Sequence, residues 1–302
     1  MELCLGTVQF GMKYGVNNVL DRQPTWEESF EMLDYAIANG INFIDTARAY
    51  GEAEIVLGEY LKNHSNDNLH IISKLRPNIV NSDEKDVYGV LVKEIEESLR
   101  RLNIDRLDGY LLHTPEYIYV PEIVSAMIKI KEKGYVEHLG ISIYDVKEGM
   151  AAIDIDAMDY IQMPYSILDQ RGKKEDFFKV AKRRGVKVFT RSAFLQGLFM
   201  MPKETIPKHL NRAIPYLDVM NSILEKYQVD KVSAIIEFVK YESEIDYLVF
   251  GVEKLEQLQE DLLKFKQQEV PEACILELKE QINNVEQSII FPSLWSNGKK
   301  AE

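Results

Sequence analysis

Short apolar runs alternate with longer amphipathic stretches along the whole chain, and this alternation is what most restricts its fold. Each run has the length of one buried strand. Strands that alternate regularly with helices form a parallel sheet, and eight such units in 302 residues predict one closed α/β barrel, the (β/α)8 or TIM barrel. The eight predicted strands are Leu3–Thr7, Ile41–Asp45, His70–Lys74, Leu107–His113, Val136–Ser142, Tyr160–Met163, Val186–Arg191 and Tyr247–Gly251.

The stretches between these runs have helical periodicity. In the third stretch, apolar side chains recur every three or four residues at Val87, Leu91, Ile95, Leu99 and Leu102. Polar and charged side chains occupy the other faces, which is typical of a helix packed on a sheet. The predicted helices are Trp26–Asn39, Glu54–Lys62, Glu84–Leu102, Val120–Lys133, Asp145–Ile153, Lys173–Arg184, Tyr216–Lys226 with Lys231–Tyr241, and Leu255–Lys264.

An open doubly wound sheet is the alternative to a barrel. Such a sheet usually carries G-x-G-x-x-G after its first strand, whereas the segment Leu5–Gly11 reads LGTVQFG. We therefore expect one barrel domain over residues 1–302, with a C-terminal tail (about 286–302) that folds over or near the barrel mouth. The longer loop Met201–Tyr216 is a candidate lid.

Composition and charge exclude several classes of function. The net charge is −13 with basic residues interspersed among acidic ones, which argues against a nucleic-acid partner. No apolar run approaches ~18 residues and the N-terminus has no signal-peptide pattern, so we expect a cytoplasmic protein without a membrane partner. Cys4 and Cys274 lie far apart, and neither the cysteines nor the five histidines have metal-ligand spacing, so no metal site is predicted. The oligomeric state stays open.

Polar residues end most of the predicted strands. In a (β/α)8 barrel the active site lies at the carboxyl ends of the strands. Each of four residues has an ordinary explanation when it is taken alone. Asp45 could cap a turn, and Lys74 could be a solvated surface lysine. His113 could be an ordinary loop residue, and Tyr50 a packing aromatic. Together these explanations weaken, because one fold brings all four to the same mouth. The strand-end residues are Thr7, Asp45, Lys74, His113, Ser142, Gln162, Arg191 and Gly251.

These four side chains suit the protonation of an oxygen that gains negative charge. The ordinary pKa of a tyrosine, about 10, is too high for a good proton donor near neutrality. A lysine ammonium nearby is expected to lower it, with Asp45 keeping Lys74 charged and in place. His113 would orient the substrate oxygen. A carbonyl that receives a hydride is such a substrate.

The segment Asp45–Glu54, DTARAYGEAE, followed by Gly58, closely resembles the signature of the aldo-keto reductase superfamily. The resemblance covers nearly the whole chain and looks most like bacterial members. It places the family's Asp, Tyr, Lys and His tetrad on Asp45, Tyr50, Lys74 and His113. It implies a (β/α)8 barrel that reduces an aldehyde or ketone without metal, using NADPH or less often NADH, with Tyr50 as the general acid.

The resemblance also implies coenzyme contacts at the strand ends. Ser142 and Gln162 match positions that hydrogen-bond the nicotinamide carboxamide, although Ile143 replaces the family's usual asparagine. Arg191 stands where many members stack an aromatic ring on the nicotinamide, and its guanidinium plane could stack there instead. The pyrophosphate is expected along Ser192, Phe194, Leu195 and Gly197.

The adenine end is expected at Phe250–Asp261, FGVEKLEQLQED, where the last strand meets its helix. Many NADPH-preferring members carry several basic residues here, whereas this segment has only Lys254, with Glu253 beside it. Family habit favours NADPH, and NADH stays possible. The expected contacts at this end are Gly251, Lys254, Gln257 and Asp261.

Two alternative functions are compatible with the same fold but differ in their chemistry. Some members of the superfamily are cofactor-sensing partner subunits, and an intact tetrad does not exclude that role. A barrel aldolase with Lys74 as a Schiff base is a second alternative. The sequence does not specify the small-molecule carbonyl substrate, although the segment VQFGMKYGV is similar to bacterial members that handle sugar-derived carbonyls.

Overall fold

Eight parallel strands form a closed barrel in the computed structural model, which describes residues 1–64, 68–81, 83–267 and 270–295. Consecutive strands pair in sequence order, and β1 pairs with β8 to close the sheet. The predicted (β/α)8 fold is therefore confirmed. The strands are β1 (Glu2–Gly6), β2 (Phe43–Asp45), β3 (His70–Lys74), β4 (Leu107–Leu112), β5 (Val136–Ser142), β6 (Met158–Pro164), β7 (Lys187–Arg191) and β8 (Tyr247–Gly251).

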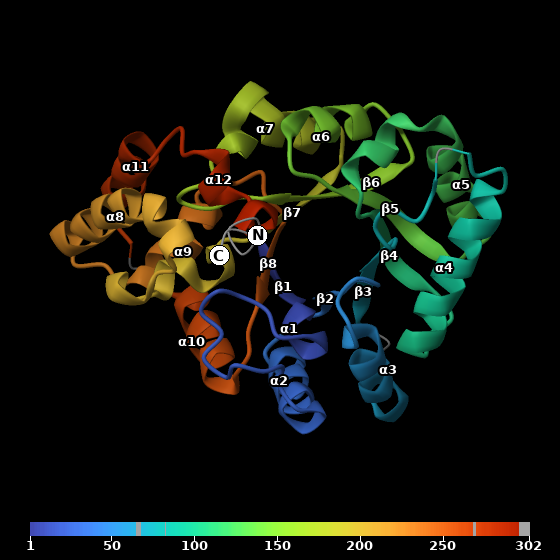
Figure 1. The fold of residues 1–302 in the computed structure, drawn as a ribbon, viewed down its shortest axis with the longest axis horizontal. Coiled ribbons are helices and arrows are strands. Elements are labelled where there is room, and N and C mark those ends of the chain that lie inside the picture. Colours follow the sequence, from blue (N-terminus) through green and yellow to red (C-terminus); the bar gives the residue numbers. More distant parts are fainter. Residues whose placement is uncertain (65–67, 82, 268–269, 296–302) are drawn as a thin grey trace.

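The helices surround the barrel (Figure 1). Two of them, α8 and α9, lie between β7 and β8, while α11 and α12 follow the last barrel helix, α10. The α-helices are α1 (Val8–Gly11), α2 (Trp26–Ala38), α3 (Ala53–Asn63), α4 (Val87–Leu102), α5 (Pro121–Glu132), α6 (Val146–Ile153), α7 (Phe177–Arg183), α8 (Ile214–Tyr227), α9 (Lys231–Lys240), α10 (Leu255–Lys266), α11 (Glu272–Gln281) and α12 (Gln287–Ile290). The short 3₁₀ helices are η1 (Pro115–Tyr119), η2 (Arg171–Asp176), η3 (Leu195–Met200), η4 (Lys203–Thr205) and η5 (Lys208–Ala213).

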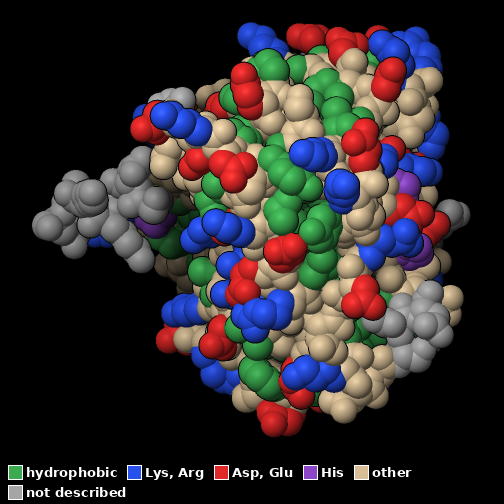
Figure 2. All heavy atoms as spheres, turned by 90° about the vertical axis from the view of Figure 1, so that its right-hand side faces the viewer, with side chains coloured by type: hydrophobic (Ala, Val, Ile, Leu, Met, Phe, Trp, Pro, Cys, Tyr) green, Lys and Arg blue, Asp and Glu red, His purple; other side chains and the backbone are tan. Residues whose placement is uncertain are grey.

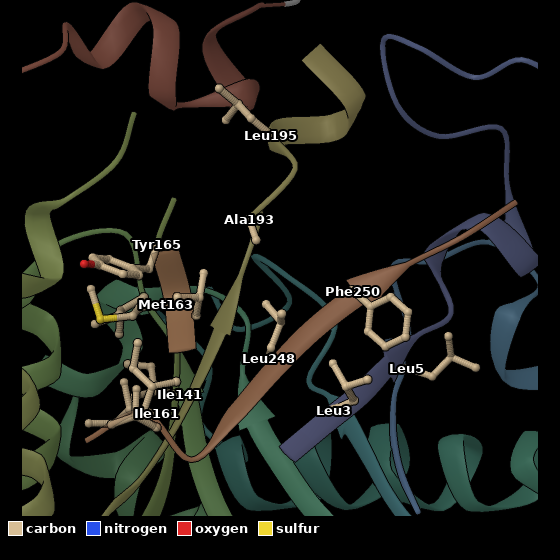
Figure 3. Close-up of a cluster of buried hydrophobic side chains, with 14 of the residues drawn as sticks. Leu3, Leu5, Ile141, Ile161, Met163, Tyr165, Ala193, Leu195, Leu248 and Phe250 are labelled. Carbon is tan, nitrogen blue, oxygen red and sulfur yellow. The ribbon is translucent and has the colours of Figure 1, made fainter. Parts of the chain in front are cut away.

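Alternate strand residues build two separate cores, because successive side chains of a strand point to opposite faces. On β1, Leu3 and Leu5 belong to the large cluster between sheet and helices, as Leu248 and Phe250 do on β8 (Figure 3). Cys4, between the two leucines, belongs to a second cluster that fills the barrel. Both faces of the sheet are thus apolar, which explains why the strands appear in the sequence as nearly continuous apolar runs.

The element boundaries differ from the predicted ones where a side chain is buried outside regular structure. Ile41 is buried, but its backbone N–H donates to Ala36 at the end of α2, so β2 starts only at Phe43. His113 follows β4 instead of ending it. The candidate lid, Met201–Tyr216, contains η4, η5 and the first residues of α8.

The C-terminal segment packs back onto the β5 and β6 loops. Phe291 makes an edge-on contact with Tyr144, at 5.6 Å between ring centroids, and the Arg171 guanidinium carbon lies over the Phe291 ring, 4.1 Å from its centroid. Trp295 donates from Nε1 to the Ile289 carbonyl over 3.1 Å. The tail was predicted over about 286–302, of which 296–302 lie outside the described residues. That residues 1–302 form one domain stays a prediction.

The surface carries mixed charges. On the side of the barrel where α4 and α5 lie, Lys and Arg side chains are interspersed with Asp and Glu (Figure 2). Within the described ranges, every helix is too short or too polar to cross a membrane.

Gly58, from the signature segment, lets α3 approach α4. A Cβ at this position would lie 1.9 Å from the backbone oxygen of Arg101. Because a backbone atom cannot move aside cheaply, we expect Gly58→Ala to lower the free energy of unfolding by about 1–3 kcal/mol or more. Urea denaturation measures the change in the free energy of unfolding. The control is Lys62→Ala on the exposed face of α3, which should change this free energy by less than about 0.5 kcal/mol. Equal midpoints for the two variants would contradict the close-approach argument.

Candidate active site

A cavity of about 400 Å³ opens at the carboxyl ends of the strands, within the size range of small-molecule and cofactor sites. Nearly all the side chains predicted for the site line it. Lys74 lies behind Asp45 rather than in the cavity wall, and Lys254 does not line it either. The predicted residues that line the cavity are Asp45, Tyr50, His113, Ser142, Gln162, Arg191, Ser192, Phe194, Leu195, Gly197, Gly251, Gln257 and Asp261.

A buried ion pair forms the floor of the cavity. Lys74 ends β3 with 0% of its side chain exposed, and its Nζ donates to Asp45 Oδ1 over 2.6 Å and to the Thr46 carbonyl over 2.9 Å. The same Asp45 oxygen accepts from Gln162 Nε2 over 2.7 Å. Burial lowers the pKa of Lys74, and the adjacent Asp45 carboxylate opposes this by favouring the ammonium. This geometry is the one expected if Asp45 is the counter-ion of Lys74, as the sequence predicts.

Tyr50 lies in the turn between β2 and α3 and faces the same cavity. The turn packs tightly on α1, since a Cβ at Gly11 would lie 1.8 Å from the Tyr50 carbonyl oxygen. Lys74 Nζ is 5.0 Å from the centroid of the phenol ring. Burial, followed by the charge of Asp45, raises the pKa of Tyr50 well above 10. The predicted net lowering of this pKa is therefore wrong for this arrangement, because desolvation of the phenol and the charge of Asp45 outweigh the nearby positive charges.

His113 completes the group. Its ring meets the Tyr50 ring edge-on at 5.9 Å, and its buried Nδ1 has no hydrogen-bond partner among the described residues. Burial, with the positive charges of Lys74 and Arg191, lowers the pKa of His113 to about 3. The ring is therefore neutral near pH 7, with one N–H donor and one acceptor nitrogen.

This lowered pKa predicts a pH dependence of stability. Between about pH 6.5 and pH 3 the unfolded chain binds a proton at His113 that the folded protein excludes, so stability falls as the pH falls. Compared with His113→Asn, the wild type should lose up to about 1.4 kcal/mol more per pH unit between pH 6 and 4. Urea denaturation at several pH values measures the difference. If the free energies of unfolding of the two proteins change in parallel with pH, then His113 is protonated as easily in the folded protein as in the unfolded chain.

Arg191 is held at the end of β7 by its neighbours. Its guanidinium carbon lies 4.8 Å from the Tyr144 ring centroid, and Nη2 donates to the Ile143 carbonyl over 3.2 Å. Ile143, which replaces the family's asparagine, is fully buried. The loop after β5 therefore contributes the Tyr144 ring and the Ile143 carbonyl oxygen, which position Arg191. Ile143 has no side-chain amide such as the asparagine of the family pattern would supply.

The segment after β7 has an unusual backbone. Ser192, Leu195 and Gln196 have φ of 63°, 46° and 54°, and Gly197 follows with 85°. Non-glycine residues in this region are strained and gather at functional sites, and turns of this kind expose backbone N–H groups that bind anions. This segment, 192–197, is where the pyrophosphate was predicted.

The first loop (residues 12–25) crosses the cavity between the β7 and β8 ends. Gln196 Nε2 donates to the Tyr14 hydroxyl over 3.0 Å, and the Val16 N–H donates to the Gln196 carbonyl over the same distance. Farther along, the Val19 N–H donates to Glu253 Oε1 over 2.8 Å. The loop is thus fastened on both sides of the cavity.

Several lining residues were not predicted. They include Tyr144, two residues after the β5 end, and Asn17 and Gln196 around the first loop. Glu253 and Glu260 line the part of the cavity at the β8–α10 loop, where Gly251, Lys254, Gln257 and Asp261 were predicted. Tyr144 and Glu253 could have been predicted from the sequence, because each lies two residues after a strand end. The contacts of the first loop have no such signal in the sequence. In the described parts of the chain, no three His, Cys, Asp or Glu side chains are placed to hold a metal ion.

Comparison with known proteins agrees with this geometry. The model of the aldo/keto reductase family matches residues 2–281. The NADH-specific methylglyoxal reductase of Escherichia coli is 24% identical over 290 residues, covering 85% of this chain and 87% of that protein. The D-arabinose 1-dehydrogenase of Saccharomyces cerevisiae is 32% identical over 140 residues, 42% of this chain and 41% of that protein. A holo-form aldo-keto reductase structure from Bacillus halodurans aligns with a TM-score of 0.75 at 22% identity, covering 96% and 95% of the two chains.

Proposed function

The chain belongs to the aldo/keto reductase family, and we propose that it reduces an aldehyde or ketone to an alcohol with a nicotinamide dinucleotide and Tyr50 as the general acid. The observation that carries the proposal is the convergence of Tyr50, His113 and the Asp45–Lys74 pair at one end of a cavity. The family and the fold define the class of reaction, and these four side chains are the proposed catalytic group.

The order of the chemical groups around the cavity suits a dinucleotide, and its volume of about 400 Å³ lies in the range of cofactor sites. Ser142 and Gln162 lie at the tetrad end and offer polar atoms to a carboxamide. The strained segment 192–197 suits the pyrophosphate, and the β8–α10 loop remains for the adenosine. When bound, the coenzyme supplies a hydride to the carbonyl carbon.

The protein supplies the proton. The raised pKa keeps the Tyr50 hydroxyl protonated. The substrate oxygen becomes a strongly basic alkoxide as the carbonyl accepts a hydride, and this basicity allows it to take the proton even from a weak acid. The neutral His113 ring offers an N–H that orients the same oxygen. The Lys74 ammonium, 5.0 Å from the phenol ring centroid, favours the phenolate that remains after the proton leaves.

The proposed substrates are small carbonyl compounds, sugar-derived ones included. Two relatives are named for methylglyoxal and for D-arabinose, which are small and rich in oxygen. The polar groups of Tyr50, His113 and Arg191 in the cavity wall suit a substrate of this kind. A Schiff base on Lys74 is disfavoured, because its side chain is fully buried and already donates to Asp45 and Thr46.

Coenzyme titration followed by a carbonyl panel tests the proposal. Fluorescence of NADH and NADPH should change on binding, and the bound coenzyme should reduce at least one small aldehyde or ketone at about 1 s⁻¹ or faster. Tight binding with no turnover across the panel would instead support the cofactor-sensing role. A substrate adduct trapped by borohydride on Lys74 would support the aldolase.

A further inference from the structure

The adenosine end of the cavity can be located from the rest of the site, and the inference here rests on the proposed function. The nicotinamide must lie beside Tyr50 and His113, because the carbonyl has to meet both the hydride and the proton. The segment 192–197, which we propose for the pyrophosphate, lines the cavity directly after the end of β7. The adenosine is therefore left with the β8–α10 loop and the first turns of α10.

Carboxyl groups dominate this end. Glu253, Glu260 and Asp261 all line the cavity. Among the described residues, the one Lys or Arg side chain in the cavity wall is Arg191, which packs against Tyr144 of the β5–α6 loop. Burial, followed by the charge of Glu260, raises the pKa of Asp261 to about 7, as expected where acids gather without a cation.

Glu253 is fixed in the wall. Its side chain is 5% exposed, and Oε1 accepts from the Val19 N–H of the first loop over 2.8 Å. Its own N–H donates to Gln257 Oε1 over 2.9 Å, which fixes the backbone beside it. The carboxylate therefore cannot swing out of the cavity to make room for a second anion without releasing the first loop.

The neighbouring cation does not compensate. Lys254 lies outside the cavity wall, and its charge acts on Glu28 of α2. The pKa of Glu28 is lowered to about 2, chiefly by its hydrogen bonds with Arg22 and to a smaller extent by the charge of Lys254. The one basic residue of the segment Phe250–Asp261 thus acts on a carboxylate that does not line the cavity.

We propose that Glu253 makes the protein select NADH against NADPH. A carboxylate accepts a hydrogen bond from a ribose 2′-hydroxyl, whereas a 2′-phosphate needs a basic partner. The phosphate carries nearly two negative charges at neutral pH and would meet three carboxyl groups. Because juxtaposed like charges are strongly unfavourable, we expect NADH to bind about 100-fold more tightly than NADPH.

Equilibrium titration of the full chain with each coenzyme, read by fluorescence, tests this without turnover. Glu253→Gln keeps an oxygen for the Val19 N–H and removes the charge. It should narrow the NADH-to-NADPH affinity ratio by about ten-fold, mostly by tighter NADPH binding. Glu256→Gln is the matched control, since Glu256 is exposed in the first turn of α10, three residues after Glu253, and lies outside the cavity wall. It should leave the ratio unchanged.

The outcomes separate this inference from the proposed function. If NADPH binds the wild type as tightly as NADH, the selectivity is overturned and the reductase proposal stands. If neither coenzyme binds, the proposed function itself fails. An unchanged ratio in a folded Glu253→Gln protein would remove Glu253 as the determinant. Should that variant not fold, Glu260→Gln, at an exposed residue of the same wall, takes its place and should also narrow the ratio.

Fragments of the coenzyme give a second readout that does not involve the nicotinamide. Adenosine 5′-monophosphate and adenosine 2′,5′-bisphosphate differ only in the 2′-phosphate. The monophosphate should displace bound NADH at a concentration at least about ten-fold lower than the bisphosphate. Stronger displacement by the bisphosphate would show that the adenosine end accepts the extra phosphate and would overturn the proposal.

Discussion

Tyr50→Phe should lower kcat by about 10²–10⁴-fold and leave the dissociation constant of the coenzyme within about two-fold. The variant removes the one hydroxyl that the proposed mechanism uses as a proton donor. The ring stays, so its edge-on contact with His113 and the packing of Gly11 on the turn stay as well. Stopped-flow measurement of a single turnover, beside a coenzyme titration, separates loss of chemistry from loss of binding.

The control for this variant is Tyr135→Phe. Its hydroxyl donates to Glu96 at 2.9 Å on the outside of the barrel, away from the cavity, so kcat should be unchanged. Reduction at the wild-type rate in Tyr50→Phe would reject Tyr50 as the general acid. It would also turn attention to His113, whose ring lies against Tyr50 and carries an exchangeable proton.

The strand ends could be predicted because the information about them is local. Asp45, Lys74 and Ser142 each close a run of apolar residues, and the barrel fold makes those ends converge whatever the loops do. Gln162 was predicted as a strand-end residue too, and its Nε2 donates to Asp45. These predictions needed only strand periodicity and a signature of ten residues.

Contacts between distant segments could not be predicted in the same way. Glu253 is held by Val19, 234 positions earlier in the chain, and no periodicity links the two. The sign of the Tyr50 pKa shift also depended on packing, because desolvation of the phenol is a property of the closed site. Helix α11 was missed for a related reason: few of its side chains are buried, so its apolar pattern is weak.

Lys74→Met should lower the free energy of unfolding by about 3–5 kcal/mol, the largest stability effect expected in the site. Methionine fills much of the volume but leaves the Asp45 carboxylate, 2% exposed, with Gln162 as its remaining side-chain donor. A buried charge without its counter-ion is costly, whereas the intact pair contributes little net stability. Urea denaturation measures the loss, and the double variant Lys74→Met with Asp45→Asn should recover about 2 kcal/mol because it removes the orphaned charge.

The matched control is Lys131→Met. Lys131 and Asp159 are also 2.6 Å apart, but about a third of each side chain is exposed, so the same substitution should cost below about 1 kcal/mol. If Lys74→Met costs no more than Lys131→Met, water reaches the pair and Asp45 is not the buried counter-ion inferred here. If the double variant is no more stable than Lys74→Met, the cost comes from packing instead of charge. Either result would weaken the view that the pair is kept for its charge near Tyr50, since apolar residues would fill the same space without a desolvation penalty.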